Sequence, residues 1–115
     1  MTRILLIAIA FVAPAAIAQA ADTPAKAPSG RAVYEYWCVP CHAPGPGHPG
    51  TQSLQMKYGG KVPAVLLDRT DLSPQVVSTF VRQGVLLMAP FRKTEITDTE
   101  LAALSAYVAK NFESN

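Results

Sequence analysis

The stretch YEYWCVPCHAPG, residues 34–45, contains the only two cysteines of the chain, Cys38 and Cys41, with His42 directly after the second. Such a spacing is compatible with a structural zinc site, a redox-active thiol pair, a structural disulfide or the covalent attachment of a prosthetic group. The rest of the sequence discriminates among these four chemistries.

The N-terminal segment predicts export. Arg3 precedes an apolar run at residues 4–13, and Ala18-Gln19-Ala20 supplies small residues for cleavage. This is the anatomy of a secretory signal peptide over residues 1–20, cleaved between Ala20 and Ala21. The apolar run is shorter than the ~20 residues that a membrane span needs. We therefore expect a periplasmic protein whose mature chain does not insert stably into the membrane.

After cleavage, residues 21–29 are rich in alanine and proline and are expected to form a flexible leader, followed by one domain over residues 30–115. Arg3 is the only one of the ten basic residues in the signal peptide, so nine remain against eight acidic residues. This balance gives no electrostatic reason to expect nucleic-acid binding. A domain this small often needs a bound group or crosslink to complete its core.

Helical signals recur along the domain, and no run alternates like a strand. Ser29 is a candidate N-cap before Val33, Tyr34 and Trp37, which fall at helical spacing. The proline- and glycine-rich residues 43–51 predict a loop, and short helices are expected at 52–58 and 63–67.

The two C-terminal helices have clearer ends. Ser73 and Pro74 predict a start and Gly84 an end, and residues 85–94 follow as an irregular stretch. Thr97 and Glu100 then form a capping box before a helix with an apolar stripe at Leu101, Leu104, Tyr107 and Val108. The sequence thus predicts an all-α domain of short helices and long loops.

This context favours haem among the four chemistries. Zinc lacks ligands, because His48 is the only other histidine and there is no third cysteine. A thioredoxin-like pair is expected in a βαβ setting, and a disulfide closing so short a loop adds little stability. Cys-X-X-Cys-His is the attachment sequence of c-type haem, in which Cys38 and Cys41 bind the porphyrin and His42 binds iron. A disulfide remains the alternative.

With these residues in view, the chain resembles class I cytochromes c. The resemblance rests on a first helix with Gly30 and Tyr34, the Cys-X-X-Cys-His motif, a methionine loop and a last helix with Leu104 and Tyr107. It implies that the N- and C-terminal helices cross, with the glycine allowing close approach and the aromatic rings packing at the crossing. It also implies one covalent haem c and electron transfer rather than catalysis.

In this family the second axial ligand is a methionine between the last two helices, which corresponds to Met88. Here Ala89 separates Met88 from Pro90, whereas the family usually has methionine directly before proline. Met56 is expected to be a core residue, and His48 is a competing ligand that would give a bis-histidine haem. If Met88 did not ligate iron, a gas-binding or peroxidatic haem protein would be the alternative function.

The resemblance also implies supporting residues. A carbonyl of a proline after the motif would accept a hydrogen bond from His42, and Pro49 is the first choice with Pro46 the alternative. The haem propionates would need donors, for which we name Trp37, Tyr58 and Arg69.

The stretches GPGHPGT, LLDRTDL and FRKTEITDTEL are similar to the cytochrome subunits of flavocytochromes that oxidise 4-alkylphenols, such as p-cresol methylhydroxylase. This similarity implies a flavoprotein partner related to vanillyl-alcohol oxidase and a soluble electron acceptor. Residues 88–91 would form an apolar docking patch, with Arg82, Arg92 and Lys93 as a basic rim. The alternative is an independent periplasmic shuttle for another dehydrogenase or a terminal oxidase.

Overall fold

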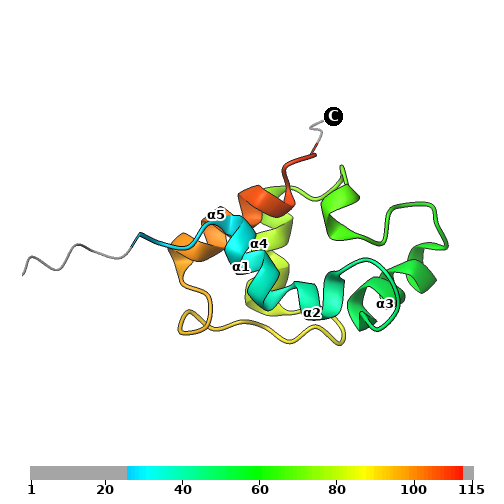
Figure 1. The fold of residues 1–115 in the computed structure, drawn as a ribbon, viewed down its shortest axis with the longest axis horizontal. Helices are drawn as coiled ribbons and strands as arrows, with labels where there is room; N and C mark the ends of the chain where they lie inside the picture. Colours follow the sequence, from blue (N-terminus) through cyan, green and yellow to red (C-terminus); the bar gives the residue numbers. More distant parts are fainter. Residues whose placement is uncertain (1–25, 113–115) are drawn as a thin grey trace, which may run out of the picture.

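The computed structural model describes residues 26–112, so the predicted signal peptide and the first half of the leader lie outside it. The described chain is helical, with one isolated bridge between Val85 and Met88 as its only strand-like pairing (Figure 1). The elements are α1 (Gly30–Trp37), α2 (Val39–His42), α3 (Pro49–Tyr58), the 3-10 helix η1 (Leu66–Asp68), α4 (Pro74–Gln83) and α5 (Asp98–Val108). The predicted all-α fold is confirmed.

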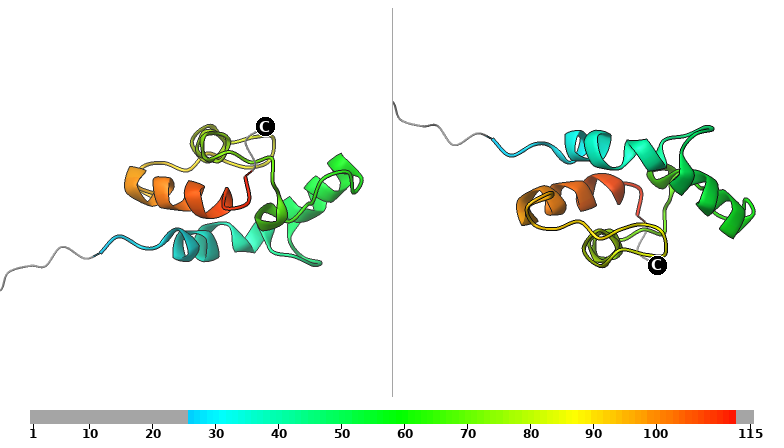
Figure 2. Two further views of the ribbon diagram at one scale, coloured as in Figure 1. Left: turned by 90° about the horizontal axis from the view of Figure 1, so that it is seen from above. Right: turned by 90° about the horizontal axis from the view of Figure 1, so that it is seen from below.

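The first and last helices cross closely, as the resemblance to class I cytochromes c implied. A Cβ atom on Gly30 would lie 2.0 Å from the carbonyl oxygen of Ala103, so only glycine permits this approach. One turn further along, the rings of Tyr34 and Tyr107 pack with their centroids 5.6 Å apart. Helix α5 also packs against α4, so it lies between α1 and α4 (Figure 2).

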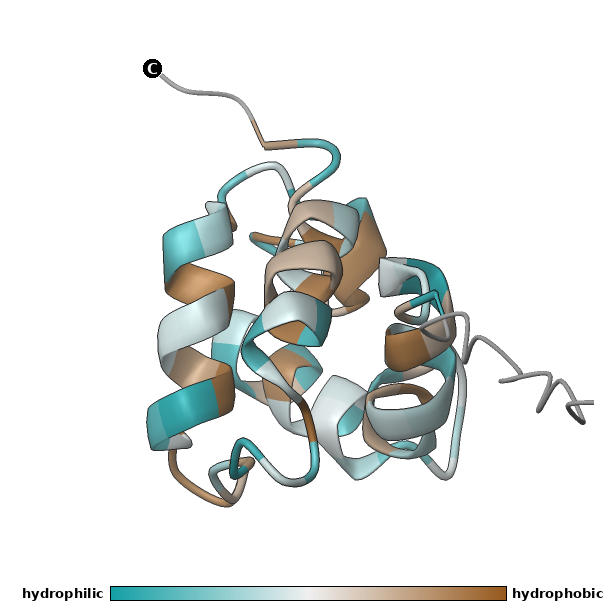
Figure 3. Ribbon diagram, turned by 90° about the vertical axis from the view of Figure 1, so that its left-hand side faces the viewer, coloured by the Kyte–Doolittle hydropathy of each residue, from teal (hydrophilic) through white to brown (hydrophobic). Residues whose placement is uncertain are grey.

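The core lies where these three helices meet. Ile96 and Leu104 are completely buried. Figure 3 shows the apolar segments gathered where the helices pack together. The other buried core residues are Val33, Tyr34, Leu72, Val77, Val81, Leu101 and Val108. Most of them come from the predicted apolar stripes, which explains why the helix faces were predictable from spacing alone.

Polar side chains define the helix starts. The hydroxyls of Ser29 and Ser73 accept hydrogen bonds from the backbone N–H groups of Ala32 and Val76, each at 3.2 Å. Thr97 and Glu100 form the complete predicted capping box. Each cap satisfies an N–H group that has no partner within its helix.

The region after the motif differs from the expectation. Helix α3 begins at Pro49, three residues earlier than predicted, because proline suits a first helical position where its missing N–H is not needed. The helix expected at 63–67 is reduced to η1. Within residues 26–112, none of the helices combines the length and apolar character that a membrane span requires.

Replacing Gly30 by alanine should destabilise the domain by about 1–3 kcal/mol, because the new methyl group must push α1 away from Ala103. The measurement is the free energy of unfolding in denaturant. Ala32→Ser, at an exposed position on the same helix, should change it by less than about 0.5 kcal/mol. Equal stabilities for the wild type and Gly30→Ala would show that the crossing is not tight.

Candidate functional site

The motif forms a helical turn that continues the direction of α1. The backbone N–H of Cys38 donates to the carbonyl of Tyr34 at 2.9 Å, and the N–H of His42 donates to the carbonyl of Cys38 at 2.8 Å. Cys38 is half-buried, Cys41 is exposed, and both are free thiols. The turn thus holds Cys38, Cys41 and His42 close together at the end of the helix that crosses α5.

The electrostatics of Cys38 disfavour a redox-active thiol pair. Burial, together with the neighbouring Cys41, raises the pKa of the Cys38 thiol to about 11. Reactive thiols in Cys-X-X-Cys motifs instead have a lowered pKa, because the thiolate is the nucleophile. A thiol that stays protonated at neutral pH is poorly suited to thiol–disulfide exchange.

His42 is seated against the start of α3. A Cβ atom on Gly50 would lie 2.6 Å from Cε1 and 2.8 Å from Nδ1 of the imidazole, so the glycine leaves the space that the ring occupies. Burial lowers the pKa of His42, which favours the neutral imidazole, in which one ring nitrogen can bind a metal. Its Nδ1 is buried and has no hydrogen-bond partner among the described residues.

Three side chains hold the backbone of the motif turn and of the loop after it. The hydroxyl of Tyr34 donates to the carbonyl of His42 at 3.4 Å, and that of Thr51 donates to the carbonyl of Ala43 at 2.9 Å. His48 Nδ1 lies 3.1 Å from the carbonyl oxygen of Pro40, to which it can donate. His48, considered above as a competing ligand, is therefore engaged with the backbone of the motif.

The hydrogen bond expected between His42 and Pro49 is not formed. Pro49 is the first residue of α3, and its carbonyl accepts from the hydroxyl of Ser53 at 2.7 Å. The α3 residue that contacts the imidazole is Gly50, which sequence reasoning missed. The only sequence signal for this contact was the Pro-Gly pair that opens α3, and such a pair is equally typical of a loop.

A second segment, residues 84–91, contains Met88 and is called the Met88 loop here. Val85 and Met88 exchange two backbone hydrogen bonds of 2.9 Å, which close a tight turn with Leu86 at φ 53°. The loop folds back on the end of α4, since a Cβ atom on Gly84 would lie 2.6 Å from the Met88 carbonyl oxygen. Met88 is thus held in a defined turn rather than in an extended loop.

Residues from the motif, η1 and the Met88 loop all pack against the buried core. They are part of a set of half-buried apolar side chains, called the apolar rim here, that pack on the buried core without being covered themselves. Its members are Trp37, Cys38, Val39, Leu66, Leu67, Val76, Met88, Phe91 and Tyr107. A thiol for attachment and a thioether for iron thus both pack on this core, and Trp37, next to Cys38, contacts Phe91 of the Met88 loop. This donor set fits a c-type haem.

The other predicted site residues lie in two places. The ring of Trp37 contacts that of Phe91 edge-on, with centroids 5.6 Å apart, so it joins α1 to the Met88 loop. Arg69 is buried and forms a bidentate ion pair with Asp71, and its guanidinium lies 4.8 Å from the ring centroid of Tyr58. Arg69 and Tyr58 are therefore brought together, whereas Trp37 packs with the Met88 loop.

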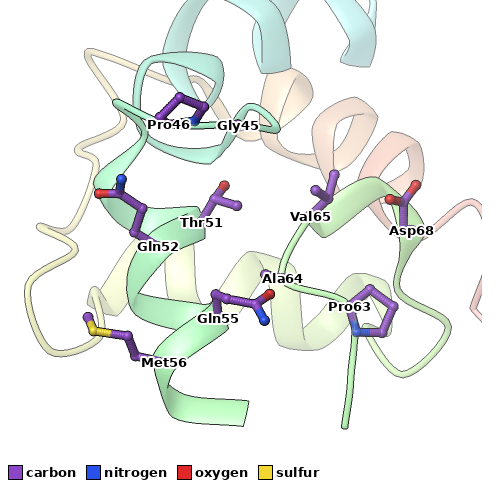
Figure 4. A pocket seen from close by; sticks show the side chains of 10 residues that line it. All are labelled: Gly45, Pro46, Thr51, Gln52, Gln55, Met56, Pro63, Ala64, Val65 and Asp68. Atoms are coloured by element: carbon purple, nitrogen blue, oxygen red, sulfur yellow. The ribbon is translucent and has the colours of Figure 1, made fainter. Parts of the chain in front are cut away.

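A cleft of about 750 Å³ lies between α3 and residues 63–68 (Figure 4). Thr51 and Val65 face it from opposite sides, and Pro46 borders it. Its lining includes none of Cys38, Cys41, His42 and Met88, so it lies beside the motif rather than at it.

Met56 also borders this cleft and is 79% exposed. The expectation that Met56 belongs to the core is wrong, because it lies on the outer side of α3.

Residues 25–108 match the protein family described as "Cytochrome C oxidase, cbb3-type, subunit III". Searches of curated proteins and of solved structures found no match. The family match spans the motif turn, the apolar rim and the Met88 loop.

Gly50→Ala should displace the His42 imidazole, because the added methyl group would lie within 3 Å of the ring. We expect a lower yield of haem-loaded protein and a shifted haem absorption spectrum in the fraction that is loaded. Gln52→Ala, at an exposed position on the same helix, is the control and should leave both unchanged. A normal yield and spectrum in Gly50→Ala would show that α3 does not position His42.

Proposed function

The chain belongs to the family of cytochrome c oxidase, cbb3-type, subunit III, and we propose that it passes single electrons from a flavoprotein dehydrogenase to a further redox protein. It is a mono-haem c-type cytochrome of class I, with covalently bound haem c, and it transfers electrons rather than catalysing a reaction. When bound, the haem iron supplies a one-electron change between its ferric and ferrous states.

The residues carry distinct roles in this proposal. Cys38 and Cys41 would attach the haem, and His42 and Met88 would bind the iron. The observation that supports this most is that Trp37, next to Cys38, contacts Phe91 of the Met88 loop, which brings these distant parts of the chain together. A neutral imidazole and a thioether are both suitable axial ligands, and the thioether favours the ferrous state.

Arg69 and Tyr58 are proposed to act together near a haem propionate. Their contact is supported by the cation–π distance of 4.8 Å, and Asp71 orients the guanidinium through two hydrogen bonds. A buried arginine keeps its charge and is well suited to a carboxylate. Trp37 is better placed to support the Met88 loop through Phe91 than to join this pair.

Met88→Ala should abolish the weak far-red sulfur-to-iron band of the oxidised protein, whereas Met56→Ala should retain it. Met56 is the matched control because its side chain is exposed on α3, outside the apolar rim. The measurement is the absorption spectrum of the haem-loaded variants. Loss of the band in Met56→Ala alone, or carbon monoxide binding by the reduced wild-type protein at neutral pH, would contradict ligation by Met88.

The partner proposal rests on the similarity of three sequence stretches to flavocytochrome subunits and on an exposed apolar turn. Leu86 and Leu87 are 91% and 96% exposed at the tip of the Met88 loop. Leu86 holds a left-handed backbone conformation that costs leucine about 1–2 kcal/mol. Sequence reasoning placed the docking patch at residues 88–91, but Met88 and Phe91 are half-buried and the two leucines project further. We propose that this tip contacts the flavoprotein.

The basic rim expected around this patch is largely neutralised. Lys93 forms an ion pair of 2.7 Å with Asp98, and Arg92 lies 3.5 Å from Glu95. Arg82 points into the protein and also contacts Asp98. We therefore propose that docking depends mainly on apolar contact, and its rate should respond weakly to salt.

Exchanging both Leu86 and Leu87 for serine should slow reduction by the flavoprotein about tenfold or more, because the apolar contact is lost while Met88 remains. The measurement is stopped-flow reduction of the haem by a 4-alkylphenol-oxidising flavoprotein supplied with its phenol. Tyr36→Ser, an exposed aromatic residue on α1, is the control and should leave the rate unchanged.

A second candidate function is supported by the family's name, which refers to a terminal oxidase. In that case the protein would be an independent shuttle. Fast reduction of the oxidase by this protein, and no reduction of this protein by the flavoprotein, would favour the shuttle.

Unchanged reduction of the double leucine variant by the flavoprotein would contradict the docking surface only. In both proposals residues 1–20 direct export to the periplasm.

A further inference from the structure

Arg82 occupies an unusual position at the end of α4. Its side chain is only 21% exposed, and its guanidinium reaches three acceptors on a separate segment of the chain. Nη1 donates to the carbonyl of Phe91 at 3.1 Å, and Nη2 donates to the carbonyl of Ile96 at 2.8 Å and to the carboxylate of Asp98 at 3.0 Å. One cation thus joins the end of α4 to the segment that leads into α5.

The first of these acceptors closes the Met88 loop. Phe91 is its last residue, and the Phe91 N–H donates to the carbonyl of Val81 at 2.8 Å while its carbonyl accepts from Arg82. The N–H and the carbonyl of Phe91 are therefore both bonded to the last turn of α4, through the neighbouring residues Val81 and Arg82. The loop from Gly84 to Phe91 is closed at its base by these two bonds.

The second acceptor explains why an arginine serves here. Ile96 is completely buried and lies outside any helix, and the Arg82 guanidinium supplies a donor for its carbonyl. A guanidinium presents several N–H donors in a rigid fork. Lysine could not reach these separated acceptors from one head group with the same geometry.

We propose that Arg82 is a positioning residue for Met88, and that its hydrogen bonds at the base of the loop determine how readily the loop opens and releases Met88 from the iron. This inference rests on the proposed ligation of iron by Met88. If the loop opens, the sulfur of Met88 would leave the iron and an external ligand such as imidazole would take its place, without any change in oxidation state. Arg82 therefore limits access of small ligands to the iron.

The test is a titration of the ferric, haem-loaded protein with imidazole, followed by loss of the far-red sulfur-to-iron band. The apparent affinity for imidazole scales with the fraction of molecules whose loop is open. Arg82→Met keeps the length of the side chain but removes every donor, so imidazole should bind about ten- to a hundredfold more tightly. Arg82→Lys should give a smaller increase, and it serves as the test variant if Arg82→Met does not fold.

Two controls separate positioning of Met88 from general stability. Arg92→Met alters an exposed arginine in the next segment and should leave imidazole affinity unchanged within about twofold. Ser78→Ala removes the 2.9 Å hydrogen bond to Ser105 between α4 and α5, away from the Met88 loop. It should lower the free energy of unfolding but leave imidazole affinity unchanged.

The outcomes are distinguishable. Tighter imidazole binding in the Arg82 variants, with no change in either control, supports the positioning role. If an Arg82 variant lowers global stability but binds imidazole like Ser78→Ala, Arg82 is only a structural residue and the inference is overturned. A wild-type protein without the far-red band, or a band that survives in Met88→Ala, would instead overturn the ligation by Met88, and this inference with it.

Discussion

The close crossing of α1 and α5 is the constraint on which the rest of the structure depends. Gly30 lies against the Ala103 backbone so tightly that no Cβ atom fits, and the Tyr34 and Tyr107 rings extend the contact. Because α1 leads directly into the motif turn, this crossing sets where Cys38 and His42 lie. Because α5 also packs on α4, it sets the position of the Met88 loop.

The core built on this crossing is incomplete by itself. Its buried residues are few, and nine further apolar side chains pack on them while remaining partly exposed. A small domain with many prolines and glycines often needs a bound group to complete its core. Covalently bound haem c adds a large apolar group, so the cofactor of the electron-transfer reaction is also expected to stabilise the fold.

The two proposed iron ligands are held by different means. His42 is positioned by a helical turn and by the absence of a side chain at Gly50, both local to the motif. Met88 is positioned by a tight turn whose base is anchored to α4 through Val81 and Arg82. Packing against Gly50 and hydrogen bonds from Tyr34 and Thr51 hold the histidine side. The methionine side combines its turn and the two bonds at its base with packing of Met88 and Phe91 on the core.

The sequence by itself determined the helices with clear caps, the all-α class and the haem-attachment motif, because these depend on residues close together in the chain. Ser73, the Thr97–Glu100 capping box and the spacing of Cys38, Cys41 and His42 are signals of this local kind. Only the tertiary structure showed that Met56 is exposed, that Gly50 contacts the imidazole and that Arg82 turns inward. Each of these depends on which segment packs against which, and a methionine, a glycine or an arginine has the same sequence signature on the surface as in a site. Local periodicity determines elements, whereas the neighbours of a side chain are decided by how those elements cross.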